Sequence, residues 1–163
     1  MTDPDFKKLM GIVEVDETYI GGKDKNRHWD KKQRIKSGSA KIGVIGAISG
    51  KGNAVCKMIE TADRETLNQF VSETVSDKLN LVATEEHPGY NQLCKLDFRY
   101  KKVRHNASEY VHGKVHTNYL DSFWSLLKKG VVGTYHNVSR KFFPHYPNEF
   151  SCRFNNRENS RIV

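Results

Sequence analysis

Cysteine is scarce in this chain of 163 residues. There are three cysteines, Cys56, Cys94 and Cys152, and no two of them stand in a C-x-x-C spacing. An odd number of widely spaced cysteines excludes the disulfide framework of a small secreted domain, and the missing C-x-x-C pairs exclude the common structural zinc sites. We therefore predict three buried or half-buried thiols.

Long apolar runs are also missing from the chain. No segment approaches the roughly 20 apolar residues that a membrane-spanning helix needs. Residues 1–5 lack the basic and then apolar pattern of a signal peptide. We predict a soluble cytoplasmic protein without a membrane partner.

Acidic residues are outnumbered by basic ones, with 19 Asp and Glu against 27 Lys and Arg and a formal net charge of +8. Such a balance favours an anionic partner such as nucleic acid. With 37% hydrophobic residues, the chain has enough apolar side chains for one core. We predict a single domain over residues 1–163.

Three carboxylates stand inside the most strand-like segment of the chain, residues 11–22. This segment is rich in β-branched and aromatic residues and ends at a Gly pair, which predicts a strand. Side chains alternate along a strand, so Glu14 and Asp16 share one face and Glu17 points to the other. A carboxylate on a core face must be paired or bind a metal ion. Two interpretations stay open: Asp16 is a ligand for a divalent cation, or the segment is an edge strand whose acids face water.

A basic segment follows at residues 23–39. It holds seven Lys or Arg residues and one Trp without an apolar period, which predicts a long exposed loop. Cations bind nucleic-acid phosphates and an indole can stack on a base. We predict DNA contacts for four residues, Trp29, Lys31, Lys32 and Arg34. The alternative is a solvated loop without a partner.

The next segments predict a hairpin and a helix. Residues 41–48 and 53–60 are apolar and flank a Gly-rich turn, as in a β-hairpin. Residues 63–75 carry apolar side chains at helical spacing, with Thr61 or Asp63 available as the N-cap.

Shorter elements complete the predicted fold. Residues 79–84 read as a buried strand, residues 90–95 as a short helix and residues 97–105 as a strand near an edge, and a longer helix begins near residue 117. This order of strands and helices is that of the RNase H-like fold. It is an α/β fold with a mixed five-stranded sheet flanked by helices.

Three elements of this fold each offer one acid to a shared site. Asp16 lies on the first strand, Glu85 directly follows the predicted strand at residues 79–84, and Asp121 lies in the first turn of the last helix. Alone, Asp121 would be explained by the helix dipole or by a capping box with Asn118. Because the fold brings these three places together, we predict that Asp16, Glu85 and Asp121 converge on a metal site.

Several ordered motifs of the chain resemble the ISXO2-like transposases of bacterial insertion sequences. They are VEVDETYIGGK at residues 13–23, HTN at 116–118 with FWSLLKKG at 123–130, GTYHNVS at 133–139, and NEF at 148–150 with RFNNR at 153–157. Together they span nearly the whole chain and are more specific than a set of three acids.

The resemblance implies the catalytic domain of a DDE transposase, which cleaves DNA at insertion-sequence ends and transfers the strands to target DNA. Asp16, Glu85 and Asp121 match its three catalytic acids, which would hold two Mg²⁺ or Mn²⁺ ions through oxygen ligands. Lys128, seven residues after Asp121, would contact a DNA phosphate near the cleaved end. The resemblance also implies a homo-oligomer on DNA in a bacterial cytoplasm, associated with the nucleoid.

The chain departs from the family pattern at two acids. Glu85 stands where the family has Asp, and Asp121 stands where it usually has Glu. Each exchange moves a carboxylate by roughly 1.5 Å, and a misplacement of about 1 Å can lower a rate on the order of 100-fold. Two other functions therefore stay open: a non-catalytic DNA-binding remnant of a transposase, and another RNase H-like nuclease such as a resolvase.

Both ends of the sequence carry further expectations. Family members usually have an upstream zinc-ribbon and end-binding region, whereas this sequence begins at the catalytic domain, which predicts a shortened protein or a fragment. Residues 138–163 form a basic and aromatic C-terminal extension. Within it, Pro144 and Pro147 predict a kinked helix or indicate a decaying copy of the element.

Overall fold

The computed structural model describes residues 8–21, 41–50, 52–76, 81–85, 87–96, 98–103, 118–134 and 138–159. The four predicted DNA contacts of the basic segment, Trp29, Lys31, Lys32 and Arg34, lie outside these ranges. Among the helices of the described ranges, none is both long enough and apolar enough to cross a membrane.

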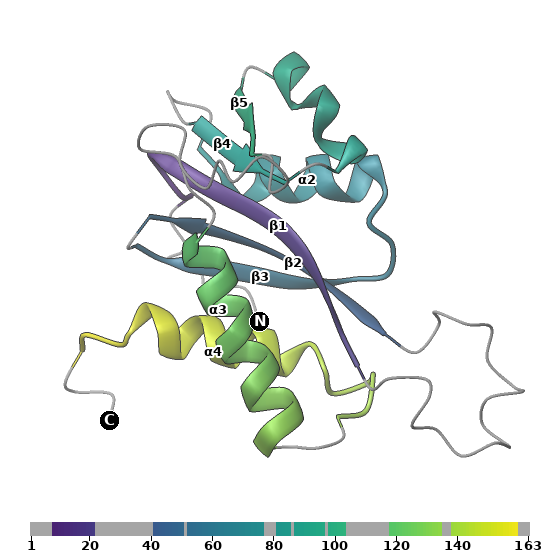
Figure 1. Ribbon diagram of the computed structural model, residues 1–163, viewed down its shortest axis with the longest axis vertical. Helices are drawn as coiled ribbons and strands as arrows, with labels where there is room; N and C mark the ends of the chain where they lie inside the picture. Colours follow the sequence, from purple (N-terminus) through teal and green to yellow (C-terminus); the bar gives the residue numbers. More distant parts are fainter. Residues whose placement is uncertain are drawn as a thin grey trace, which may run out of the picture.

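Five strands form one mixed sheet in the order β3-β2-β1-β4-β5 (Figure 1). β2 is antiparallel to β3, so the predicted hairpin is confirmed. β2 is also antiparallel to β1, whereas β4 is parallel to both β1 and β5. β1 is therefore a central strand paired on both sides, and the edge-strand interpretation of its acids is wrong. The strands are β1 (Ile12–Ile20), β2 (Ile42–Ser49), β3 (Ala54–Ile59), β4 (Leu81–Thr84) and β5 (Arg99–Lys102).

One face of the sheet is covered by α2 (Arg64–Thr74) and the 3₁₀ helix η2 (Pro88–Leu96). The side chain of Asp63 accepts a hydrogen bond from the N–H of Thr66, so Asp63 is the N-cap of α2. Val13 and Val15 of β1 point to this side, where they pack in one buried cluster with side chains of α2 and η2. Full burial of each such apolar side chain stabilises the fold by about 1.5–3 kcal/mol.

The opposite face is covered by α3 (Asn118–Lys129), which continues into the π-helical turn η4 (Gly130–Thr134), and by α4 (His145–Asn155). Figure 1 shows α3 in green crossing the sheet and α4 in yellow beside it. The rings of Phe123 on α3 and Phe154 on α4 meet edge to face with their centroids 5.4 Å apart. The predicted apolar stripe of α3 is confirmed, because four residues are buried: Leu120, Phe123, Trp124 and Leu127.

Two sequence predictions are wrong. Pro144 is the N-cap of α4 and Pro147 lies in its first turn, where the backbone N–H groups have no helical partner, so both prolines start the helix instead of kinking it.

Cys56 is buried as predicted, but Cys152 is exposed. The reason is that Ser151, its neighbour on α4, takes the inward position, with Oγ 3.0 Å from Sγ of Cys56.

Candidate active site

Glu14 is a carboxylate in the interior of the protein, with only 2% of the residue exposed. Its Oε2 accepts a hydrogen bond of 2.9 Å from the backbone N–H of Leu120. Leu120 is in the first turn of α3, where N–H groups have no partner within the helix and the helix dipole favours a negative charge. Glu14 therefore completes the N-terminus of α3 from the central strand and holds this end of the helix on β1.

Asp16 makes a second contact between β1 and α3. Trp124 donates a hydrogen bond of 2.9 Å from its indole Nε1 to Oδ2 of Asp16. Asp16 follows Glu14 by two residues on a strand, about 6.6 Å, and Trp124 follows Leu120 by four residues on a helix, about 6 Å. Because these spacings match, both carboxylates meet their donors in one register of α3 on β1.

Gly46 of β2 provides the space for the indole. It pairs with Asp16 across the ladder between β1 and β2. A Cβ at this position would lie 2.6 Å from Cη2 and 2.8 Å from Cζ2 of Trp124. A side chain here would displace the ring, so Gly46 allows Trp124 to lie against β2 while its Nε1 reaches Asp16.

The environment of Asp16 opposes its negative charge. Burial, followed by the charges of Glu85 and then Glu17, raises the pKa of Asp16 from 3.8 to about 7, against the smaller lowering effect of the Trp124 hydrogen bond. Such an acid retains a proton where an exposed aspartate has lost it. A perturbed carboxyl beside other carboxylates is typical of a functional site and of a site that takes a divalent cation in place of a proton.

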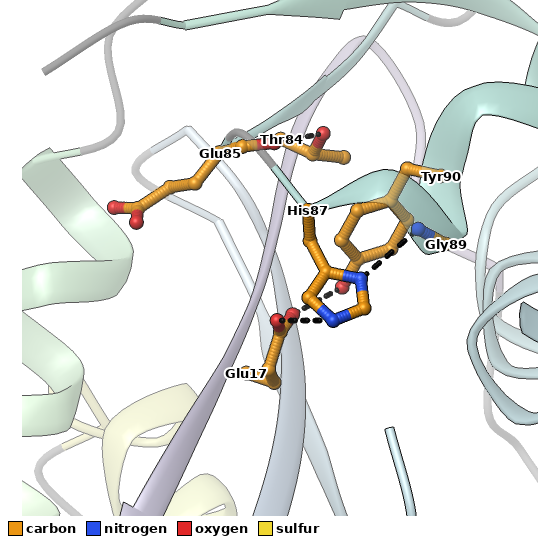
Figure 2. Close-up of polar contacts among 6 residues, drawn as sticks. All are labelled: Glu17, Thr84, Glu85, His87, Gly89 and Tyr90. Atoms are coloured by element: carbon orange, nitrogen blue, oxygen red, sulfur yellow. Dashed lines mark hydrogen bonds and ion pairs between the residues drawn. The ribbon is translucent and has the colours of Figure 1, made fainter. Parts of the chain in front are cut away.

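Glu85 directly follows β4, whose pairing with β1 ends at Thr84 opposite Val15. The backbone of Glu85 is held through its carbonyl, which accepts hydrogen bonds from Oγ1 of Thr84 at 3.0 Å and from the N–H of His87 at 2.9 Å. Figure 2 shows the Glu85 side chain pointing away from His87 and Tyr90, toward the side of the pale green α3. The structure thus places Glu85 close enough for its charge to act on Asp16.

Asp121 does not join this pair in the structure. It lies in the first turn of α3 with an exposed side chain, because its neighbours Leu120 and Trp124 take the inward positions. Within the described part of the chain, no three His, Cys, Asp or Glu side chains are grouped closely enough to hold one metal ion. Asp121 nevertheless stands one residue after one α3–β1 contact and one turn before the other. Its role as the third ligand stays a prediction.

Lys128 is exposed in the last turn of α3. Its contact with a DNA phosphate also stays a prediction.

Sequence reasoning missed the roles of Glu14, Gly46 and Trp124. One signal was present for Glu14, because it shares a strand face with Asp16 and a carboxylate on a core face needs a partner. For Gly46 and Trp124 the sequence carries no local signal, since their contact joins β2 to a helix far along the chain.

Comparison with known proteins agrees with this architecture. The family model of the ISXO2-like transposase domain matches residues 8–155. Among solved structures, the chain is similar to one in the simian T-cell lymphotropic virus intasome complexed with PP2A regulatory subunit B56 gamma, with 9% identity, a TM-score of 0.50, and coverage of 90% of this chain and 48% of that chain. At this identity the likeness concerns the fold alone, and it supports the predicted RNase H-like sheet.

Two further solved structures are similar to this chain with lower TM-scores. The magnesium-bound, dimeric HTLV-2 integrase catalytic core domain has 13% identity and a TM-score of 0.48, with coverage of 90% of this chain and 85% of that chain. A chain of the pre-cleavage Mos1 transpososome has 12% identity and a TM-score of 0.44, with coverage of 88% and 53%. A search of curated protein sequences finds no significant match.

The raised pKa of Asp16 predicts how stability depends on pH. The folded protein binds this proton more tightly than the unfolded chain, so the stabilisation is complete below about pH 4 and is lost as the pH rises through about 7. Asp16→Asn keeps an acceptor for Trp124 without the charge. We expect it to raise the metal-free stability at pH 8 by on the order of 2–4 kcal/mol, measured by thermal unfolding, with little change at pH 4. An equal decline between pH 4 and pH 8 in both proteins would assign the titration to another group.

The close approach of Gly46 to Trp124 predicts a steric effect. Gly46→Ala forces the indole off β2 and weakens its hydrogen bond to Asp16, so we expect a loss of about 1–3 kcal/mol of stability and a further rise in the pKa of Asp16. Thermal unfolding as a function of pH measures both. Gly133→Ala is the matched control, because a Cβ at Gly133 would meet no atom within 4 Å. Equal effects of the two substitutions would contradict this account of Gly46.

Proposed function

Because the chain belongs to the ISXO2-like transposase domain family, we propose that it cleaves DNA at insertion-sequence ends and transfers the strands to target DNA with the help of divalent cations. The observation that carries this proposal is the raised pKa of Asp16, to which burial and then the charge of nearby Glu85 contribute. The proposed substrates, insertion-sequence ends and target DNA, follow from the family.

The donor chemistry of the pair fits Mg²⁺ or Mn²⁺. Carboxylate oxygens are the ligands that hard cations prefer, and Mg²⁺ is commonly bound by one or two carboxylates together with substrate phosphates. A cation near Asp16 and Glu85 would relieve their repulsion. Asp121 would complete the ligand set for the two ions expected in this family.

Asp16 and Glu85 would hold cations whose contribution would be to activate a water for attack on a phosphodiester and to stabilise the leaving 3′-oxygen. The side chains of the protein would supply orientation. Trp124 fixes the direction of the Asp16 carboxylate through its Nε1, and Glu14 fixes the N-terminus of α3, next to Asp121. Lys128, on the exposed surface of α3, would bind a phosphate of the DNA strand.

A non-catalytic DNA-binding remnant is the second candidate function. The observation that favours it is the exposed position of Asp121, outside any group of three ligands in the described ranges. The exchange of acid types at Glu85 and Asp121 also favours the non-catalytic remnant, because catalysis requires more accurate placement of carboxylates than cation binding does.

Exchanging the two later acids tests which function applies. We expect the double variant Glu85→Asp with Asp121→Glu to increase Mg²⁺-dependent nicking of plasmid DNA that carries insertion-sequence ends. Each single variant should gain less, because the carboxylates act as a unit. Asp16→Asn is the inactive control.

The outcomes of this experiment separate the candidates. Equal nicking by the parent and the three variants would show that carboxylate reach does not limit the reaction. No nicking by any form, with DNA binding intact in a gel-shift assay, would favour the non-catalytic remnant.

The basic segment predicts a second, independent result. Replacing Lys31, Lys32 and Arg34 by Gln should weaken binding to all DNA sequences alike and reduce the salt dependence by about one unit of slope for each lost phosphate contact. Lys57→Gln is the control, because Lys57 lies 3.4 Å from Glu73 on the α2 side of the sheet. An unchanged salt slope in the triple variant would identify residues 23–39 as a solvated loop.

A further inference from the structure

A second polar group lies on the face of β1 opposite to Asp16, and Figure 2 shows its members Glu17, His87 and Tyr90. Glu17 points to the α2 side, and its side chain is only 11% exposed. The hydroxyl of Tyr90 donates a hydrogen bond of 2.8 Å to Oε2 of Glu17, and Nε2 of His87 lies 3.7 Å from Oε1. Both oxygens of this carboxylate therefore face side chains of the segment that follows Glu85.

This segment is folded tightly upon itself. The N–H of His87 donates to the carbonyl of Glu85 at 2.9 Å, and the N–H of Tyr90 donates to the carbonyl of His87 at 3.2 Å. The N–H of Gly89 donates to Nδ1 of His87 at 3.1 Å. Because Nδ1 is an acceptor, the proton of the neutral imidazole lies on Nε2, the nitrogen that faces Glu17.

Close packing leaves this turn little freedom. A Cβ at Gly89 would lie 2.6 Å from Cδ1 of Leu67 and 2.9 Å from Nδ1 of His87. Tyr90 is fully buried in the cluster on the α2 side. Burial and the charge of Glu17 raise the pKa of Tyr90 far above its ordinary value, so its hydroxyl remains a donor.

We propose that Glu17, His87 and Tyr90 are positioning residues for the Asp16–Glu85 site. The pairing of β4 with β1 ends at Thr84, one residue before Glu85. The hydrogen bond from Tyr90 to Glu17, with His87 packed beside it, attaches the chain to β1 again just beyond it. Glu85 is thus held between two attachments to the same strand that carries Asp16, which sets the separation of their carboxylates. This inference rests on the proposed function as a metal-dependent enzyme.

The carboxylate at position 17 has two opposing effects on the site. The charge of Glu17 adds to the repulsion that Asp16 experiences, so a negative side chain here opposes the ionisation of its neighbour. Its Oε2, however, accepts the hydroxyl of Tyr90, and Nε2 of His87 lies 3.7 Å from Oε1, so two residues of the turn lie against one residue of β1. Residues that orient metal ligands in this way commonly change metal affinity by about 10–100-fold when they are replaced.

Mn²⁺ binding measured by electron paramagnetic resonance tests the inference without any nuclease assay. We expect Tyr90→Phe to weaken Mn²⁺ affinity by about 10–100-fold, because it removes the hydroxyl and keeps the ring. Glu17→Gln, which retains an acceptor for Tyr90, should lose less affinity than Glu17→Ala. Tyr19→Phe is the matched control, because Tyr19 lies on the same strand and is 53% exposed.

A second variant keeps the test independent of the buried ring. His87→Asn retains an acceptor for the N–H of Gly89 and removes the nitrogen that faces Glu17. It should also weaken Mn²⁺ binding, and thermal unfolding without metal shows whether each variant is folded.

The outcomes distinguish two failures. If the parent protein binds Mn²⁺ and folded Tyr90→Phe and His87→Asn bind it equally well, the positioning role is wrong while the metal site stands. A lower unfolding temperature with unchanged affinity would identify the group as structural only. If the parent protein binds no Mn²⁺, the proposed metal-dependent function fails, and the positioning role fails with it.

Discussion

The attachment of α3 to the central strand through two carboxylates is the interaction on which the rest of this structure depends. Glu14 receives the N–H of Leu120 and Asp16 receives the indole N–H of Trp124, both at 2.9 Å. Removing one partner from a buried charge typically costs about 3–5 kcal/mol, more than the bond itself contributes. A shift of α3 by one residue would leave both carboxylates buried without these donors. The two contacts therefore select one register of α3 on β1. That register fixes the positions of Asp121 and of the apolar stripe of α3.

The two faces of the central strand carry acids with different surroundings. Asp16 faces α3 with Glu85 nearby, where burial and then repulsion raise its pKa to about 7. Glu17 faces α2 and is held by His87 and Tyr90. Placing three acids within one small region destabilises the protein without metal, and the well-packed core on each side of the sheet offsets this strain. A site that is unfavourable when empty of cations gains the most when a cation is bound.

The parts of the fold that follow from local periodicity were predictable. Alternation along residues 11–22 placed Glu14 and Asp16 on one face, and the apolar stripe of α3 placed Leu120 and Trp124 inward, as the structure confirms. The partner of Glu14 was not predictable, because a backbone N–H of a distant helix has no signature in the sequence. The prolines of α4 misled for a related reason: their effect depends on where a helix begins, and an N-terminal turn accommodates what an interior turn does not.

The geometry of the site relates the two acids whose types differ from the family pattern, Glu85 and Asp121. Because Glu14 and Trp124 hold α3 in place, the helix cannot move toward β1 to compensate for the shorter side chain of Asp121. The Glu85 side chain instead extends toward the side of α3 (Figure 2), and its additional C–C bond carries the carboxylate roughly 1.5 Å further in that direction. In the proposed metal site, the longer side chain of Glu85 and the shorter side chain of Asp121 would offset each other in reach. This compensation requires that the turn bearing Glu85 is rigid. Rigidity of that turn is what the contacts of His87 and Tyr90 with Glu17 supply.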